Sequence, residues 1–236
     1  MEPTEYKLMD AVESRMWWYR ALHARLRAAL AGCEGPVLDA GCGTGGLLAQ
    51  LGAGCFGLEY APAAALRAVE KSGAAVACGS VNTLPFGAGV FGAVVSADVL
   101  CHAGVAPAVA LDEFFRVLKP GGRLVLNMPA YQWMLSAHDR RVHNVLRVTA
   151  GGLRQMLVEA GFSVVRVRYW NALLLPLMLA QRLLVSRGAA SSDVAAFPPW
   201  QDALFYGITD LERRLSLAWP AGGSVLAIAE RPIDAS

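Results

Sequence analysis

The residues best suited to chemistry in this sequence are an aspartate and the glycines that follow it. The run VLDAGCGTGG at 37–46 begins with apolar residues, contains Asp39 and continues with glycines at 41, 43 and 45. Glycine lets the backbone approach a ligand where a Cβ atom would block it. The pattern predicts a buried strand that delivers a carboxylate and a loop of bare backbone to one edge of a sheet, where a small molecule binds.

Two classes of ligand bind to a strand, a glycine turn and a helix in this order. Gly41, Gly43 and Gly46 fit the GxGxxG pattern of dinucleotide sites, but this match is weak alone. A pyrophosphate at the helix N-terminus would be repelled by Asp39, whereas an α-ammonium group would be attracted to it. Glu59 ends the next predicted strand, where a carboxylate accepts hydrogen bonds from a ribose diol. An amino-acid head and a ribose together indicate S-adenosylmethionine (SAM).

Segments with strand character alternate with helical segments along most of the chain. Such an alternation is typical of an α/β protein with a doubly wound, mostly parallel sheet. The predicted strands are 37–40, 54–59, 74–79, 91–96, 123–128, 162–170 and 224–230, and the predicted helices between them begin at 47, 61, 109 and 153.

Three segments lie outside this alternation. Residues 5–31 carry apolar residues at helical spacing, and the aromatics at 16–19 cannot all face one core. Either two of them are buried and one is partly exposed, or these helices form a flap that closes over a ligand. Because ligands of open α/β sheets bind beyond the carboxyl ends of the strands, we expect 129–149 to wall the site. The chain is then a single domain with a helical flap at 1–35, a ligand-binding core at 36–170, a cap insertion at 171–223, and a last strand and tail at 224–236.

Composition and charge exclude several classes of function. The 236 residues have a net charge of +2 and no dense basic block, so a nucleic-acid partner is not expected. The five cysteines are odd in number and lack CxxC spacing, which predicts no disulfide framework and no metal site and favours the reducing cytoplasm. The N-terminus lacks the apolar core of a signal peptide, and the aliphatic block at 172–185 is shorter than the ~20 residues of a transmembrane span. We expect a cytoplasmic protein, and its oligomeric state stays open.

Four motifs stand in order between residues 36 and 130. They are VLDAGCGTGG at 37–46, GLEY at 57–60, the run from GSVNTLPF to FGAVVSADVLCH at 79–102, and EFFRVLKPGGRLVL at 113–126. With these motifs in register, the chain resembles class I SAM-dependent methyltransferases of the small-molecule type, such as quinone-biosynthesis and natural-product enzymes. The resemblance implies a Rossmann-like, seven-stranded sheet with an antiparallel last strand and helical cap elements.

The resemblance also implies which residues bind SAM. Two positions depart from the family pattern: Ser80 replaces an aspartate that commonly contacts the adenine amine, and Gly92 replaces an acid. The first departure puts adenine recognition by a side chain in doubt, and the second is a structural difference. The implied contacts are Asp39, Gly41, Cys42, Gly43 and Gly45 for the methionine portion, Glu59 for the ribose, Tyr60 beside the adenine, Ser80, Val81 and Asn82 for the adenine edge, and Ser96 and Ala97 near the sulfonium.

Catalysis of methyl transfer makes few demands on the sequence. The reaction is an in-line displacement with a good leaving group, so alignment and exclusion of water matter most and a general base is optional. His102, beyond the fourth strand, and His138, beside Asp139, are the candidate catalytic bases. A structural role is the favoured alternative for both, because family members often carry histidine at the first position and adjacent loop residues usually point apart.

The acceptor is less constrained than the methyl donor. Six arginines between 138 and 168 would bind an acidic acceptor if they converge, and otherwise form a solvated surface, which is the favoured interpretation. The leucine-rich segment 171–185 is predicted to be a core or cap helix rather than an interfacial element for a lipid-like acceptor.

The leading hypothesis is methylation of a hydrophobic small molecule at oxygen. The alternatives are N- or C-methylation of a small or lipid-like molecule, a non-catalytic SAM-binding partner subunit and, least favoured, a nicotinamide oxidoreductase.

Overall fold

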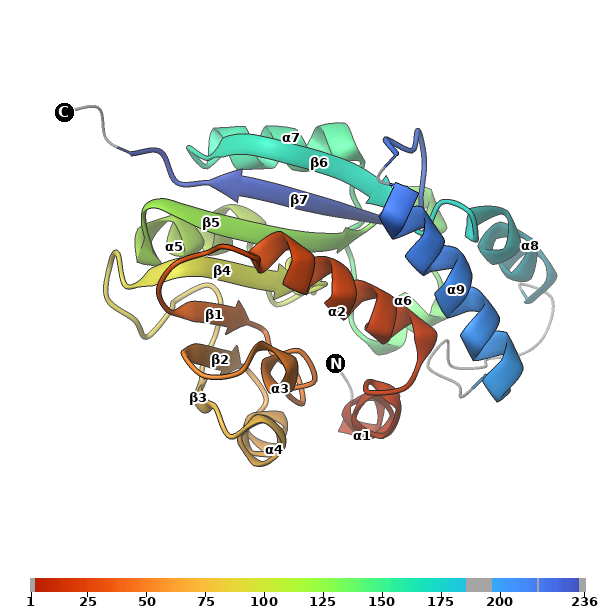
Figure 1. Ribbon diagram of the computed structural model, residues 1–236, viewed down its shortest axis with the longest axis horizontal. Coiled ribbons are helices and arrows are strands. Elements are labelled where there is room, and N and C mark those ends of the chain that lie inside the picture. Colours follow the sequence, from red (N-terminus) through yellow and green to blue (C-terminus); the bar gives the residue numbers. More distant parts are fainter. Residues whose placement is uncertain (1–2, 186–196, 216, 234–236) are drawn as a thin grey trace.

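Seven strands form one sheet in the order β3-β2-β1-β4-β5-β7-β6 (Figure 1). The computed structural model describes residues 3–185, 197–215 and 217–233. β7 runs antiparallel to β5 and β6, whereas the pairs among β1 to β5 are parallel. The predicted Rossmann-like fold, with its antiparallel last strand, is therefore confirmed. The strands are β1 (Val37–Ala40), β2 (Cys55–Glu59), β3 (Ala75–Cys78), β4 (Phe91–Ala97), β5 (Leu118–Pro129), β6 (Ser163–Trp170) and β7 (Ser224–Glu230).

Helices cover both faces of the sheet. Because side chains along a strand point to alternate faces, Val94 packs in the core cluster that includes α5 and α7, and Val95 packs in the cluster that includes α2. Because both faces of the central strands are buried, their sequences are continuous runs of apolar residues. Among the described residues, no helix has the length and apolarity that crossing a membrane requires. The helices are α1 (Pro3–Val12), α2 (Trp17–Leu30), α3 (Leu48–Leu51), α4 (Pro62–Ser72), α5 (Pro107–Val117), α6 (Ala137–Arg141), α7 (Ala150–Glu159), α8 (Leu175–Val185) and α9 (Pro199–Leu215), with a 3-10 turn at Gln132–Met134.

The register of the parallel strands places the segments that follow β1, β2 and β4 at one edge of the sheet. Ala40 at the end of β1 lies opposite Leu58 of β2, and Ala97 at the end of β4 lies opposite Asn127 of β5. The glycine turn, Glu59 and the residues that follow β4 therefore leave the sheet side by side. This edge is where the sequence predicts the ligand.

The structure departs most from the predicted elements at β5. The strand was expected at 123–128, but it begins at Leu118, which pairs with Phe91 of β4. The next pair is Ala93 with Arg123, so residues 119–122 bulge out of the ladder. The KPGG sequence thus interrupts a strand, whereas the sequence pattern predicts that it separates a helix from a strand.

The insertion between β6 and β7 contributes α8 and α9, and α9 packs beside α2. Asp202 of α9 accepts a hydrogen bond from the Trp17 backbone N–H at 2.6 Å, and Glu212 accepts one from the Ala172 N–H at 2.8 Å. Figure 1 shows α8 and α9 beyond the end of the sheet at which the parallel strands finish. This is the position expected of a cap, although the division of the chain into flap, core and cap stays a prediction.

Candidate active site

A cavity of about 1500 Å³ lies at the edge of the sheet where β1, β2 and β4 end. Its wall is formed by the glycine turn, the ends of these strands, α1, α2, the segment 129–149 and part of α8. A site for one small ligand usually measures about 300–1,000 Å³. The cavity therefore has room for a cofactor and an acceptor together.

Two carboxylates mark the part of the cavity beside the glycine turn. Asp39 is 3% exposed, and burial, together with the charges of Glu59 and Glu13, raises its pKa to about 8. Within the described part of the chain, no hydrogen bond reaches the Asp39 carboxyl. The Glu59 carboxylate accepts hydrogen bonds from the backbone N–H groups of Gly43 at 3.0 Å and Ala61 at 2.9 Å. Because a cation favours the ionised form of a buried acid, Asp39 fits an ammonium group.

The glycine turn is shaped by backbone conformations that other residues rarely adopt. Gly41 has a φ of +91°, and a Cβ atom there would lie 2.2 Å from a methyl carbon of Val99. Gly45 has a φ of +88°, and a Cβ atom there would lie 2.8 Å from the Cα atom of Ala68 in α4. The turn is therefore pressed between the residues after β4 on one side and α4 on the other, so side chains are excluded at both positions.

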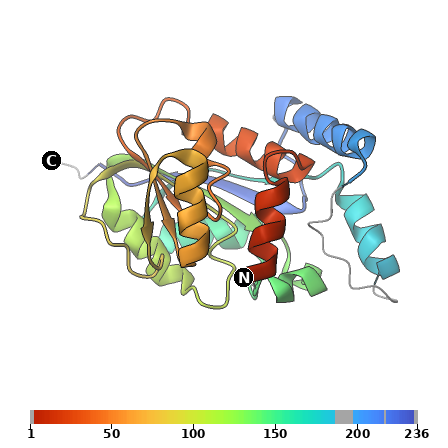
Figure 2. The ribbon, with the colours of Figure 1, turned by 90° about the horizontal axis from the view of Figure 1, so that it is seen from below.

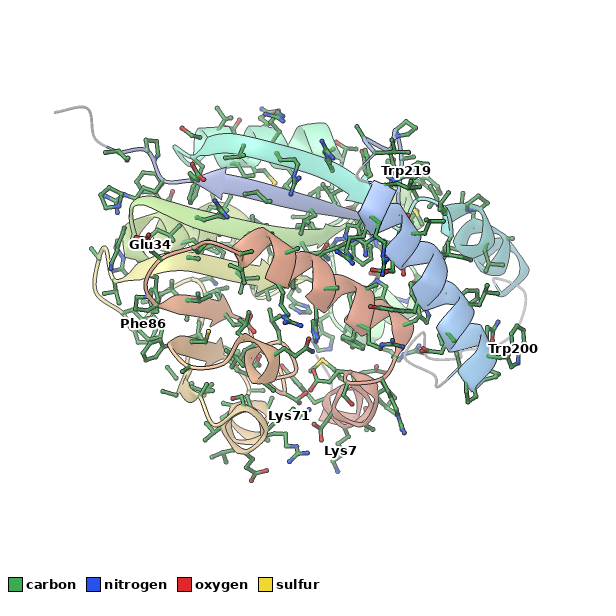
Figure 3. The ribbon with its side chains drawn as sticks, in the orientation of Figure 1. Lys7, Glu34, Lys71, Phe86, Trp200 and Trp219 are labelled. Atoms are coloured by element: carbon green, nitrogen blue, oxygen red, sulfur yellow. The ribbon has the colours of Figure 1, made fainter. Side chains whose placement is uncertain are left out.

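The first helix lies directly on the glycine turn. The Tyr6 hydroxyl donates to Glu59 at 2.8 Å, and Glu13 accepts from the Thr44 hydroxyl at 2.6 Å. Lys71 of α4 forms ion pairs with both Glu13 and Asp10, and Figure 3 labels it on the side of α4 that faces α1. Figures 1 and 2 show α1 and α4 as neighbours. Residues of α1, like the aromatics at 16–19, therefore border the cavity, and their action as a flap stays a prediction.

Most of the residues that the resemblance assigns to SAM line this cavity. Three of them do not: Gly45 faces α4, Asn82 joins the 80–83 turn to Gly104 and Ala106, and Ser96 donates its hydroxyl to the Ala40 carbonyl at 2.7 Å. These three residues are therefore not part of the cavity wall. The assigned residues that line the cavity are Asp39, Gly41, Cys42, Gly43, Glu59, Tyr60, Ser80, Val81 and Ala97.

Aromatic and apolar side chains form the rest of the wall. Trp17 is buried against Phe205 with a centroid distance of 5.6 Å, and Trp18 stacks on Trp170 at 6.2 Å. Both, with Tyr19, border the cavity. Because Trp17 is buried and Trp18 and Tyr19 are half-buried, the interpretation that two of the rings are buried is wrong. All three rings border the cavity, and closure over a ligand stays a prediction.

The two predicted catalytic histidines differ in what the structure shows of them. His102 lies in the cavity wall, and burial lowers its pKa to about 4, while a hydrogen bond to the Val142 backbone opposes this shift. Its Nδ1 atom is buried and has no hydrogen-bond partner in the described structure. His138 belongs to α6, and its side chain lies outside the described residues. A catalytic role for either histidine stays a prediction.

Arg140 and Arg147 are the arginines after β5 that border the cavity, and the charge of Arg147 is already paired. Arg147 is buried and paired with Asp139 at 2.9 Å, and Arg141 is paired with Glu5 at 3.4 Å. Arg140 borders the cavity but is exposed. Arg154, Arg166 and Arg168 are not among the residues of the wall. The cavity therefore offers little to an acidic acceptor.

The structure adds one acidic residue that the sequence interpretation missed. Asp98 follows β4, borders the cavity and has a φ of +54°. The Asn127 side-chain amide donates to it at 2.9 Å, and burial raises its pKa to about 7. Asp39 and Glu59 were singled out because each is an acid at the carboxyl end of a predicted strand. The same criterion would also have identified Asp98.

Comparison with known proteins identifies a methyltransferase domain within the chain. Residues 38–126 match the model of a methyltransferase domain family, and this range contains the glycine turn, Glu59 and Asp98. The chain contains a class I SAM-dependent methyltransferase domain. SAM is the cofactor of this domain, and the unpaired Asp39 carboxyl beside the Glu59 carboxylate fits its ammonium and ribose groups.

The relatives of this methyltransferase domain act on varied acceptors. The chain is 31% identical over 156 residues to 24-methylenesterol C-methyltransferase 2 of Oryza sativa subsp. japonica, a match that covers 55% of this chain and 42% of that protein. It is 30% identical over 148 residues to the O-methyltransferase cnsE of Penicillium expansum, covering 56% and 53%. The chain thus spans about half the length of the curated relatives it matches.

Solved structures share the fold of the methyltransferase domain at low identity. A SAM-dependent methyltransferase of Thermotoga maritima aligns with a TM-score of 0.63 and 18% identity over 97% of this chain and 95% of that chain. Geranyl diphosphate C-methyltransferase of Streptomyces coelicolor A3(2), solved with S-adenosyl-L-homocysteine, aligns with a TM-score of 0.61 and 17% identity over 90% and 77%. These likenesses establish the fold.

Proposed function

We propose that this protein transfers a methyl group from SAM to a small, mostly apolar acceptor, with oxygen as the receiving atom. The observation that carries the proposal is the continuity of one cavity of about 1500 Å³ from the carboxylates beside the glycine turn to the aromatic wall of α2. The first part suits the donor, and the second suits an apolar ring or chain.

The side chains of the site have separable tasks in this reaction. SAM supplies an electrophilic methyl group on a sulfonium. Asp39 and Glu59 hold the ammonium and the ribose, which fixes the donor against the end of β1. Trp18 and Tyr19 exclude water from the acceptor half and present ring faces to an apolar acceptor.

The choice of oxygen rests on the titratable groups that border the cavity, because a hydroxyl acceptor must lose a proton. N- or C-methylation remains the alternative, since relatives with different acceptors share the same domain. A SAM-binding partner subunit without catalysis is the alternative outside enzymes. We also place the reaction in the cytoplasm, because the five cysteines have no framework spacing.

Binding of the donor is tested by thermal denaturation. SAM at a hundredfold excess over its Kd is expected to stabilise the protein by about 2.7 kcal/mol. In a domain of this size, that free energy raises the Tm by about 5–10 °C. NAD at the same concentration is the control and is expected to leave the Tm unchanged. A shift with NAD and none with SAM or S-adenosyl-L-homocysteine would overturn the proposal.

A further inference from the structure

Asp98 lies where the two halves of the cavity meet. It directly follows Ala97, the last residue of β4, and it precedes Val99, whose side chain packs against Gly41 of the glycine turn. On the other side, Asn127 belongs to β5, which leads into the acceptor wall at 129–149. The Asp98 carboxyl therefore borders both the donor half and the acceptor half.

One oxygen of this carboxyl is held in place and the other is free. The Asn127 Nδ2 atom donates to Asp98 Oδ1 at 2.9 Å, and Asn127 Oδ1 accepts from the Trp170 indole N–H at 2.7 Å. Asn127 is fully buried, so this chain of hydrogen bonds fixes the carboxyl group. In the described part of the chain, no hydrogen bond reaches Asp98 Oδ2.

Among the described residues, no positively charged side chain is paired with Asp98 alone. Arg147 is the positive group that acts on its pKa, and this arginine is already paired with Asp139. The pKa of Tyr19 is raised by burial first and then by nearby acids that include Asp98. The Cys101 thiol donates to the Asp98 backbone carbonyl at 3.1 Å, and its pKa is raised by burial and by Asp98. Neither neighbour supplies a cation.

We propose that Asp98 is the general base of the reaction and that the acceptor is a neutral molecule with a hydroxyl proton, which the free Oδ2 atom of Asp98 removes. This inference rests on the proposed function and deepens it. The proton passes to Asp98 while the bond from the acceptor oxygen to the methyl carbon forms and the sulfur–carbon bond breaks, its electron pair staying on sulfur. The charge of the sulfonium is lost in the same step, and the acid formed at Asp98 is neutral.

Asp98 suits this task better than His102. The Nδ1 atom of His102 is buried without a hydrogen-bond partner, and the low pKa of the ring, caused by burial, makes it a weak base. The pKa of about 7 at Asp98, caused by burial and moderated by Asn127, lies near the value that a general base needs at neutral pH.

The proposal is tested with Asp98→Asn and two phenols. Asparagine keeps an oxygen that accepts from Asn127 but cannot take a proton. With phenol as acceptor, kcat is expected to fall by about 10²–10⁴-fold, the usual contribution of a general base. With 2,4-dinitrophenol, which is already ionised at pH 7.5, the ratio of variant to wild-type kcat is expected to stay within threefold. Asp112→Asn, the same change on the exposed side of α5, is the matched control.

Each outcome decides between the base role and its rivals. Equal losses of kcat on both phenols would overturn the base role and assign Asp98 to positioning or to the sulfonium charge. Unchanged kcat on phenol would overturn it as well. If the wild-type protein binds SAM and methylates neither phenol, transfer to phenols fails, and the titration of the Asp98 carboxyl decides the base role by itself.

A second measurement does not depend on turnover. The ¹³C carboxyl signal of Asp98 is identified as the aspartate signal that disappears in Asp98→Asn. In the complex with S-adenosyl-L-homocysteine, this signal is expected to titrate at about pH 7. The wild-type kcat for phenol should rise with pH through the same value, because the base acts when it is ionised. A carboxyl signal that stays ionised down to pH 5 would overturn the proposal. Calorimetry with S-adenosyl-L-homocysteine should give the same Kd for Asp98→Asn and wild type, which excludes a folding defect.

Discussion

Replacing Asp39 by asparagine is expected to weaken SAM binding and, at the same time, to stabilise the ligand-free protein. The Asp39 carboxyl is 3% exposed and is the group that we assign to the ammonium of SAM. Removing one partner of a buried charged pair costs about 2–5 kcal/mol. The affinity for SAM should therefore fall roughly 30- to 4,000-fold.

The gain in stability follows from the pKa of Asp39. Burial raises this pKa from its ordinary value of 3.8 to about 8. Between these pH values the unfolded chain releases the proton and the folded protein keeps it, so Asp39 lowers the free energy of unfolding as the pH rises. The penalty is absent below the lower value and complete above the higher one. Asparagine carries no charge, so the variant should gain stability that increases with pH, and each 1 kcal/mol should raise the Tm by about 2–4 °C.

Thermal denaturation at pH 5 and pH 8, combined with calorimetric titration of SAM, measures both effects. Asp112→Asn, on the exposed side of α5, is the control for the loss of an acid elsewhere. The assignment of Asp39 would be wrong if the variant bound SAM with the wild-type Kd. If the variant gained no stability relative to wild type between pH 5 and pH 8, ionisation of Asp39 would not destabilise the folded protein.

Replacing Arg147 by methionine is expected to cause the largest loss of stability near the site. The Arg147 guanidinium donates to both oxygens of Asp139 at 2.9 Å and to the Ala130 carbonyl at 3.1 Å. Burial acts to raise the pKa of Asp139, and Arg147 outweighs it, so the pKa lies below its usual value. Without the arginine, a carboxylate that is 1% exposed loses its cation. Breaking a buried pair from one side costs about 3–5 kcal/mol, or about 6–20 °C in Tm.

Arg140→Met provides the matched comparison, because Arg140 belongs to the same segment and its side chain is exposed. A surface change of this kind usually alters stability by less than about 0.5 kcal/mol. Urea denaturation of both variants and of wild type gives the free energies of unfolding directly. Equal stability of Arg147→Met and Arg140→Met would show that the buried pair does not hold the acceptor wall together.

The sequence predicted those parts of the site that depend on strand ends. Asp39 and Glu59 terminate short apolar runs, and parallel strands place such ends at one edge of the sheet. The order of strands and helices followed from hydrophobic periodicity in the same way. The start of β5 was missed because a bulge lets residues 119–122 leave the ladder without ending the strand, and periodicity does not record a bulge.

Contacts between distant segments could not be predicted in the same way. Tyr6 and Glu59 are separated by 53 residues, and a helical pattern in α1 does not reveal which element the helix covers. Asp98 and Asn127 meet because β4 and β5 are neighbours in a particular register. The family resemblance implied that Ser96 lies near the sulfonium, but its hydroxyl donates to the Ala40 carbonyl, a contact that only the pairing of β1 with β4 reveals.

The position of α1 on the glycine turn has a consequence for the speed of turnover. Tyr6 holds the carboxylate that we assign to the ribose, and the ion pairs of Asp10 and Glu13 with Lys71 tie the same helix to α4. Departure of the demethylated product and detachment of α1 should therefore be coupled events. When such a motion limits turnover, the first cycle is faster than later ones.

We therefore expect a burst of methylated product in the first turnover, followed by a slower steady state. Raising the ionic strength screens the partly exposed ion pairs of Asp10 with Lys71 and Arg67, so the steady-state rate should rise while the burst rate stays constant. Rapid-quench measurements at low and high salt would separate the two rates. If the steady-state rate equals the burst rate, the chemical step, and not detachment of α1, limits turnover.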